Sequence, residues 1–235
     1  MGERTIIVTG ANRGIGAAIA EDLLRRGYRV MALCRSPSNS IGEYIHCDVA
    51  DASSIASAVA AASACGNLVG IVNNAGMHAE ARSSELTADA FDSMMAVNAR
   101  SVLIASREVR PHLIQNGGGL IVNIGSLFDK LGIARNAAYC ASKAAVGALT
   151  RCLAAEWASD GIRVVNVAPG YIVTDLNRSF TESERGRAWL ARRVPIGRAG
   201  HVDEVARLVG ALFSENLSFL SGETIYLDGA QGINQ

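Results

Sequence analysis

The sequence predicts an α/β fold, a single doubly wound domain over residues 1–235 with a seven-stranded parallel sheet and helices on both faces. Strand-like and helix-like segments alternate along the chain, which is typical of a parallel sheet with crossover helices. The strand-like segments are apolar throughout, as expected where helices cover both faces of the sheet. No repeat, low-complexity run or linker divides the chain.

Hydrophobic periodicity and turn residues place the individual elements. The expected strands are residues 4–8, 28–34, 44–47, 68–73, 119–124, 163–167 and 224–227. The expected helices are residues 14–26, 52–63, 90–115, 137–159, 183–191 and 203–213. Pro111 lies inside the 90–115 segment, where a proline is expected to end or kink a helix.

Composition argues against several classes of partner. The 22 basic and 22 acidic residues give a net charge of zero, which predicts no binding to nucleic acid or to an anionic membrane. No apolar run reaches the ~18 residues of a membrane span, and no targeting signal is recognised, which favours a cytoplasmic location. The five cysteines show no CxxC or CxxH spacing, so we expect reduced thiols and no metal site.

A glycine-rich turn joins the first strand to the first helix. Residues 9–16 read Thr-Gly-Ala-Asn-Arg-Gly-Ile-Gly. Glycines at such a turn let backbone N–H groups approach a pyrophosphate at a helix N-terminus, where the helix dipole favours an anion. An ordinary turn is the alternative interpretation, but the position between strand and helix favours a nucleotide site.

Tyr139 and Lys143 are four residues apart in a predicted helix, so their side chains share one face. An ammonium close to a phenol favours the phenolate, which predicts a lowered pKa for Tyr139 and a group able to exchange protons near neutral pH. The alternative is a surface pair without chemistry. Only two lysines, Lys130 and Lys143, occur in the chain, which makes a chance Tyr–Lys pair improbable.

Several motifs together resemble the short-chain dehydrogenase/reductase family over residues 5–230. They are Thr9 to Gly16, Asp48-Val49, Asn73-Asn74-Ala75-Gly76, Asn98, Ser126, Tyr139-x-x-x-Lys143, Pro169-Gly170 and Thr174. The resemblance implies a Rossmann-type fold and hydride transfer between a nicotinamide and a carbonyl or alcohol carbon. It implies four catalytic residues: Tyr139 as general acid or base, Ser126 bonding the substrate oxygen, Lys143 on the nicotinamide ribose, and Asn98 anchoring a water of the proton relay in an interrupted helix.

The resemblance also implies a set of cofactor-binding residues: Gly10, Asn12, Arg13, Gly14, Ile15, Gly16, Arg35, Asp48, Val49, Asn74, Ala75, Gly76, Tyr139, Lys143, Pro169, Gly170, Ile172 and Thr174. Asp48 is placed at the adenine, with a helix N-cap as its alternative role. No acid follows the second strand to accept from a ribose 2′-hydroxyl, whereas Arg35 and Arg13 suit a 2′-phosphate, which favours NADP(H) over NAD(H).

Substrate class is left open by the sequence. The chain is similar to 3-oxoacyl-carrier-protein reductases, and Arg178 matches one basic position for docking an acyl carrier protein, while residues 116–119 lack the other. The segment 37–43, between the second and third predicted strands, is also too short to contain the helix that these reductases usually have there. A β-ketoacyl thioester or a small ketone is the expected substrate. A sugar- or steroid-type alcohol dehydrogenase, an epimerase with tightly held NAD, and an inactive dinucleotide-sensing protein are the alternatives.

Two segments rich in small residues, 96–108 and 137–157, are apolar nearly all round. Helices of this kind need burial on both sides. Relatives use them as subunit interfaces, so the resemblance implies a homo-oligomer, a tetramer or a dimer.

Overall fold

One parallel sheet organises the chain in the computed structural model, which describes residues 3–37, 41–175, 177–215 and 217–233. Its strand order is β3-β2-β1-β4-β5-β6-β9. The strands are β1 (Arg4–Thr9), β2 (Arg29–Cys34), β3 (Glu43–His46), β4 (Asn67–Asn73), β5 (Gly119–Ile124), β6 (Ile162–Pro169) and β9 (Thr224–Leu227). The predicted seven-stranded parallel sheet is therefore confirmed. The strand order reverses between β1 and β4, which is where open α/β sheets bind ligands.

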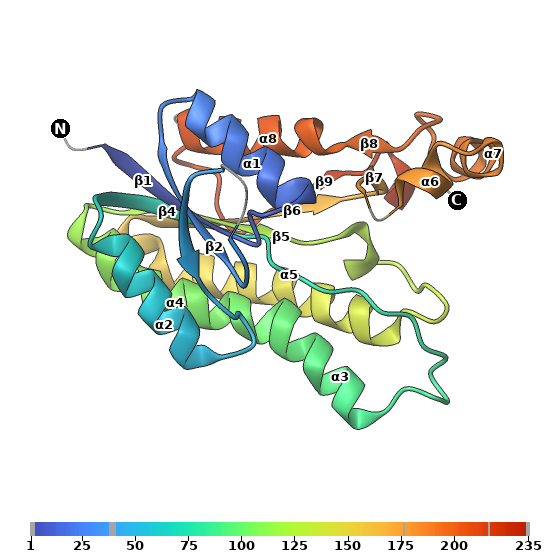
Figure 1. Cartoon of the computed structure of the whole chain (residues 1–235), viewed down its shortest axis with the longest axis horizontal. Helices are drawn as coiled ribbons and strands as arrows, with labels where there is room; N and C mark the ends of the chain where they lie inside the picture. Colours follow the sequence, from blue (N-terminus) through green and yellow to red (C-terminus); the bar gives the residue numbers. More distant parts are fainter. Residues whose placement is uncertain (1–2, 38–40, 176, 216, 234–235) are drawn as a thin grey trace.

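Helices cover both faces of this sheet (Figure 1). The helices α1 (Gly14–Arg25) and α8 (Val202–Ser214) lie on one face, and α2 (Ala52–Ser63), α4 (Ser101–Gln115) and α5 (Ala137–Trp157) lie on the other. Successive residues of β1 enter different cores: Ile6 packs with the α1 and α8 residues, while Ile7 packs with those of α2, α4 and α5. This division explains why the strands are apolar on both faces.

The predicted helix over 90–115 consists of three segments. They are α3 (Ala88–Met95), the π-helical turn η1 (Ala96–Arg100) and α4, so the helix is interrupted around Asn98. Pro111 does not end α4, which continues to Gln115. Val109 and Leu113, both fully buried, hold the helix against the sheet across the proline and offset its lost hydrogen bond.

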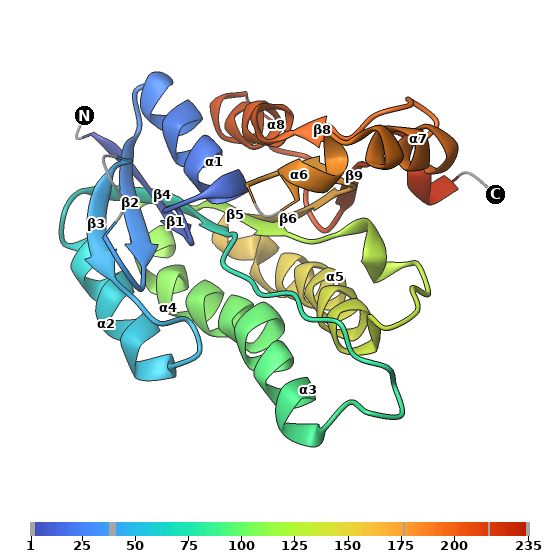
Figure 2. The same ribbon diagram turned by 45° about the vertical axis from the view of Figure 1, so that its right-hand side comes forward.

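A small outer unit follows β6 and lies beyond the carboxyl ends of the strands (Figure 2). It comprises β7 (Ile172–Val173), α6 (Arg178–Thr181), α7 (Glu184–Arg193) and β8 (Gly200–His201), where β7 and β8 pair in parallel. Leu190, Val194 and Ala199 form its buried core. The pairing of β7 with β8, which the sequence pattern did not predict, closes this unit over the sheet edge.

The remaining elements are short helical turns: η2 (Leu127–Asp129), η3 (Ala158–Asp160) and η4 (Gln231–Ile233). The predicted short connection 37–43 includes residues 38–40, which lie outside the described residues. Within the described ranges, no helix has the length and apolar character required to traverse a bilayer.

Candidate active site

The predicted catalytic side chains gather at the carboxyl end of β5. Ser126 follows this strand directly, and α5 supplies Tyr139 and Lys143. Lys143 Nζ donates a 2.8 Å hydrogen bond to Ile124 O at the end of β5 and lies 5.7 Å from the centre of the Tyr139 ring. Asn98 reaches the same helix, because its Nδ2 donates to Ser142 Oγ at 3.0 Å.

Burial sets the acidity of both titratable side chains. Desolvation raises the pKa of Tyr139, a hydrogen bond with the Ser126 hydroxyl partly opposes this rise, and the nearby Cys140 adds to it. Burial lowers the pKa of Lys143 from 10.5 to about 8. The predicted lowering of the Tyr139 pKa is therefore wrong for the protein alone, because burial disfavours the charged phenolate.

Ser126 is held in an extended conformation that directs its hydroxyl into the site. Its backbone φ is −167°, it is buried, and its Oγ accepts a 3.2 Å bond from Phe128 N. The side chain therefore caps the η2 turn and meets Tyr139 at the same time. A capping bond of this kind fixes the serine rotamer.

Asn98 ties the interrupted helix to the segment after β4. Its Oδ1 accepts from Met77 N at 2.8 Å, and its Nδ2 donates to Met77 O at 2.9 Å. With the bond to Ser142, both amide hydrogens are used within the protein. A Cβ added at Gly76 would lie 3.3 Å from Asn98 Oδ1 and 3.9 Å from Lys143 Nζ, so the Gly76 backbone passes beside both side chains.

His78 contacts Tyr139 and Asn136 contacts His78, although no sequence motif predicted either residue. His78 meets the Tyr139 ring edge to face with 4.8 Å between ring centres, and its Nε2 lies 2.6 Å from Asn136 Oδ1. The available signals were their positions: His78 comes two residues after Gly76, and Asn136 immediately precedes the helix that carries Tyr139.

The glycine-rich turn forms a closely packed cradle at the start of α1. Gly10 and Gly14 have positive φ values of 66° and 55°. A Cβ at Gly16 would collide with Asn74 Nδ2 and with Gly10 O. No side chain caps α1, and no acid stands in its first turn. Free N–H groups and the helix dipole at this end therefore suit an anionic phosphate.

Asn74 and Ala75 lock the segment after β4 onto this cradle. The backbone N–H groups of both residues donate to Thr9 Oγ1 at 3.0 Å. Asn74 Nδ2 donates to Thr9 O at 3.0 Å and to Gly10 O at 3.2 Å. The two segments that flank the reversal of strand order consequently form one rigid wall.

The predicted adenine-side residues lie after β2 and β3. Arg35 and the adjoining Arg13 and Asn12 of the glycine turn are exposed, and Ile15 packs partly against the α1–α8 core. Asp48 Oδ1 accepts from Ala50 N at 3.0 Å, and Val49 packs partly against the opposite core. Asp51, not Asp48, caps α2 by accepting from Ser53 N, so the alternative role for Asp48 as helix cap is wrong.

The residues after β6 face the glycine turn. Pro169 ends β6, and a Cβ at Gly170 would lie 2.7 Å from the Asp228 backbone, which explains the glycine. Thr174 Cγ2 is the nearest neighbour, at 3.8 Å, of a Cβ placed at Gly14. Thr174 N donates a 2.8 Å hydrogen bond to Asn177 Oδ1.

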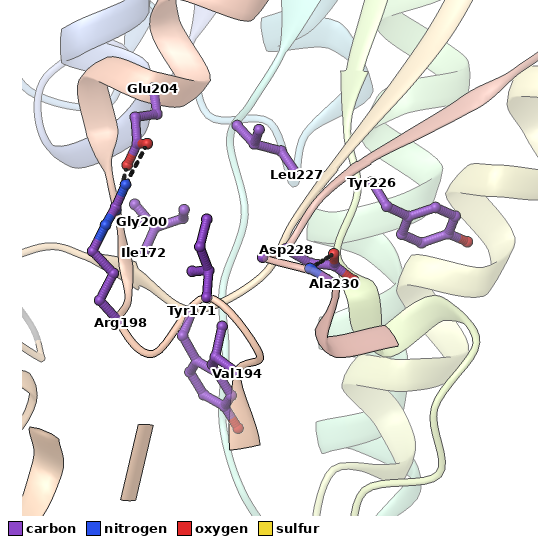
Figure 3. Close-up of a pocket in the computed structure, with 12 residues that line it drawn as sticks. Tyr171, Ile172, Val194, Arg198, Gly200, Glu204, Tyr226, Leu227, Asp228 and Ala230 are labelled. Carbon is purple, nitrogen blue, oxygen red and sulfur yellow. Dashed lines mark hydrogen bonds and ion pairs between the residues drawn. The ribbon is translucent and has the colours of Figure 1, made fainter. Parts of the chain in front are cut away.

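A separate cavity of about 220 Å³ lies between β9 and the outer unit (Figure 3). Ile172, Val194 and Leu227 line it, and the Arg198–Glu204 ion pair closes one side with a 2.9 Å contact. Neither Tyr139 nor Lys143 lines this cavity. Ile172, which was predicted to bind the cofactor, therefore lines a cavity distinct from the predicted catalytic side chains.

Comparisons with known proteins agree with this arrangement. Residues 10–231 match the protein family described as enoyl-(acyl carrier protein) reductase. D-threitol dehydrogenase of Mycolicibacterium smegmatis is 33% identical over 243 residues, covering 98% of this chain and 93% of that protein. A 3-oxoacyl-(acyl-carrier-protein) reductase of Salmonella typhimurium is 35% identical over 233 residues, 95% of each.

A solved structure shares both fold and extent with this chain. The gluconate 5-dehydrogenase of Burkholderia cenocepacia, in complex with NADP and tartrate, has a TM-score of 0.91 at 31% identity. The match covers 99% of this chain and 96% of that one. With the seven-stranded sheet and the family match over nearly its whole length, this chain belongs to the short-chain dehydrogenase/reductase family of oxidoreductases.

Proposed function

We propose that this chain is an NADP(H)-dependent oxidoreductase that interconverts a carbonyl and a secondary alcohol, with Tyr139 as general acid and base. The observation that carries the proposal is the buried Lys143 ammonium, which lies 5.7 Å from the Tyr139 ring beside the Ser126 hydroxyl. A surface Tyr–Lys pair would leave both groups in water, whereas Lys143 is 5% exposed.

In the proposed mechanism, a nicotinamide held at this site would supply the hydride that the carbonyl carbon receives in the reductive direction. Tyr139 donates its phenolic proton to the carbonyl oxygen, and Ser126 donates a hydrogen bond to the same oxygen. Lys143 then stabilises the phenolate that remains. Asn98 holds the segment after β4 against α5, because its amide is occupied by Met77 and Ser142. In the oxidative direction Tyr139 takes up the proton.

The cradle at α1 fits a dinucleotide. The close packing at Gly16 and the uncapped helix end leave backbone donors for the pyrophosphate. Among the described residues Lys143 Nζ has one acceptor, Ile124 O, so its other hydrogens are available to ribose hydroxyls. Arg35 and Arg13 are both exposed, and no acid stands beside Arg35 in the sequence. Both observations support NADP(H) over NAD(H).

For the substrate we propose a β-ketoacyl thioester or a small ketone, on the similarity to the 3-oxoacyl-(acyl-carrier-protein) reductase. Arg178 is engaged in ion pairs with Asp175 and Glu182, so it is less suited to docking a carrier protein than its sequence position implied. A polyol or sugar acid is the second candidate. The similarity to D-threitol dehydrogenase over 98% of the chain favours it.

The test is a panel of NADPH oxidation with acetoacetyl-CoA and small ketones, and NADP⁺ reduction with D-threitol and D-gluconate. The native protein and Tyr139→Phe are compared, and NADPH binding is followed by fluorescence. Turnover that is lost in Tyr139→Phe while NADPH still binds supports the mechanism, and the active compound identifies the substrate class. Binding of NADPH without any turnover by the native protein would support a dinucleotide-sensing protein instead.

We also propose a homo-oligomer that associates through α4 and α5. An apolar groove of about 630 Å³ runs along this face, lined by Met95, Leu103, Leu149 and Cys152 among others. Leu103 is 40% exposed at its edge. Apolar grooves of this kind on a helix pair mark contact sites for a partner surface.

A further inference from the structure

Two rings from different segments contact the Tyr139 ring. His78, from the segment after β4, meets it at an interplanar angle of 88° with ring centres 4.8 Å apart. Phe128, from the η2 turn, meets it at 85° and 5.9 Å. Edge-to-face contacts depend on the mutual orientation of the rings, so together they define the plane of the Tyr139 phenol.

The orientation of His78 is fixed in turn by Asn136. Asn136 Nδ2 donates to Ala134 O at 3.1 Å, so its Oδ1 faces His78 and accepts from His78 Nε2 at 2.6 Å. Asn136 is 4% exposed. Asn136 is the N-cap residue of α5, yet its side chain makes no capping bond. An asparagine at this position ordinarily caps the helix, so here the side chain is used for His78 instead.

The backbone around Asn136 is held in an unusual conformation by the same two segments. Arg135 has a φ of 68°, in the left-handed region that residues with a Cβ seldom adopt. Ala81 N donates to Arg135 O at 2.9 Å, and Glu80 forms a 3.4 Å ion pair with the Arg135 side chain. Strained residues of this kind persist where surrounding contacts enforce them, and they concentrate at functional sites.

We propose that His78 and Asn136 are positioning residues that hold the Tyr139 phenol in its reactive orientation. The proposal rests on the proposed function, in which Tyr139 transfers the proton. The segment after β4 and the start of α5 form a clamp, with the His78–Asn136 bond at its centre and the Ala81–Arg135 bond beside it. Reaction geometry is sensitive to such supports, since a displacement of about 1 Å costs on the order of 10²-fold in rate.

The experiment compares His78→Ala, His78→Phe, Asn136→Ala and the His78→Ala/Asn136→Ala double variant, with Arg82→Ala as control. Arg82 lies on the same segment, and among the described residues its side chain makes a single, exposed ion pair, with Glu85. We expect His78→Ala to lower kcat on the order of 10²-fold with an unchanged Kd for NADPH. His78→Phe keeps a ring against Tyr139 and should recover part of this loss. The double variant should be no slower than His78→Ala, because Asn136 acts through His78.

A titration of the Tyr139 phenol provides a measurement that needs no turnover. Ultraviolet difference spectra of each variant are recorded against the same variant carrying Tyr139→Phe, which isolates this tyrosine from the other four. Burial raises the Tyr139 pKa, so a phenol released from the clamp should titrate at lower pH in His78→Ala.

Three outcomes would contradict the positioning role of His78 and Asn136. They are an unchanged Tyr139 titration in His78→Ala, an effect confined to KM, or losses of kcat that multiply in the double variant. Failure of the proposed function looks different. In that case the native protein turns over no compound of the panel, while the titration still decides whether His78 holds Tyr139.

Discussion

Lys143 Nζ donates a 2.8 Å hydrogen bond to Ile124 O, so the lysine of α5 is anchored to the strand that precedes Ser126. This bond places a buried cation at the carboxyl end of the sheet, with one acceptor in the part of the chain that the structure describes. Burial lowers the pKa of Lys143 to about 8, so the buried ammonium reduces the stability of the folded state.

Lys143→Met should therefore abolish turnover and yet stabilise the fold near neutral pH. Between pH 8 and 10.5 the unfolded chain binds more protons than the folded one, so the native protein gains stability as pH rises through this window. At about pH 7 the full cost of the buried ammonium is present, up to about 3 kcal/mol, less about 1 kcal/mol for the bond to Ile124. Urea unfolding of the native protein and of Lys143→Met at about pH 7 and pH 10 measures the difference between their free energies of unfolding. This difference should shrink at the higher pH. A variant less stable than the native protein at both values would contradict this.

Ser126→Ala should slow reduction and shift its pH dependence. Reduction needs a protonated Tyr139, and the hydrogen bond with Ser126 lowers the pKa of that phenol. Without Ser126 the pKa rises further, so the alkaline fall of kcat should move to higher pH, while loss of the bond to the reacting oxygen costs about 10²-fold in kcat. Thr87→Ala is the matched control, because it removes an equivalent capping bond to Ala90 far from the site. An alkaline limb that moves to lower pH would refute the assignment.

Much of the fold follows from local sequence signals. The helix Ala52–Ser63 and the strand Gly119–Ile124 occur with the predicted bounds, because Asp51 caps the first and glycines bound the second. The two-residue strands Ile172–Val173 and Gly200–His201 were not predictable, since each is defined by pairing with the other across 28 residues of chain. Pro111 predicted an end or kink in the helix, but the helix continues to Gln115 because the buried Val109 and Leu113 hold it against the sheet.

In the candidate site, too, some features follow from sequence motifs and others depend on the folded structure. Spacing identifies Tyr139 with Lys143, but the direction of the Tyr139 pKa shift depends on desolvation, which a sequence does not display. His78 and Asn136 are 58 residues apart, and only the folded chain brings them together. The order of motifs therefore predicts which residues the fold brings together better than it predicts the pKa shifts of those residues.

Arg35→Ser should reduce the preference for NADPH. A charge-assisted bond from Arg35 to a 2′-phosphate is worth about 1.5–3 kcal/mol, or roughly a tenfold to hundredfold change in the Kd of NADPH. NADH lacks this phosphate, so its Kd should stay the same. Fluorescence titration with both cofactors measures the ratio, with Arg82→Ser as control. Equal losses for NADPH and NADH would show that Arg35 does not read the phosphate.

Gly16→Ala should impair both stability and cofactor binding. The added Cβ would collide with Asn74 Nδ2 and Gly10 O, so the cradle must open, at about 1–3 kcal/mol of overpacking. Gly132→Ala is the matched control, because no atom of the described residues lies within 4 Å of a Cβ at that position. Thermal unfolding and NADPH binding are compared for the two variants. If both behave like the native protein, the cradle is not the dinucleotide site that we propose.

Leu103→Arg should dissociate the proposed oligomer. Leu103 lines the groove between α4 and α5, and an arginine there places a charge where a partner helix would bury apolar surface. Leu24→Arg provides a close control, since Leu24 is also 40% exposed but lies on α1 at the opposite face of the sheet. Light scattering after gel filtration gives the mass of each variant. A monomeric Leu103→Arg beside an oligomeric Leu24→Arg assigns the interface to α4 and α5, whereas two oligomers of native mass would exclude this groove as the contact.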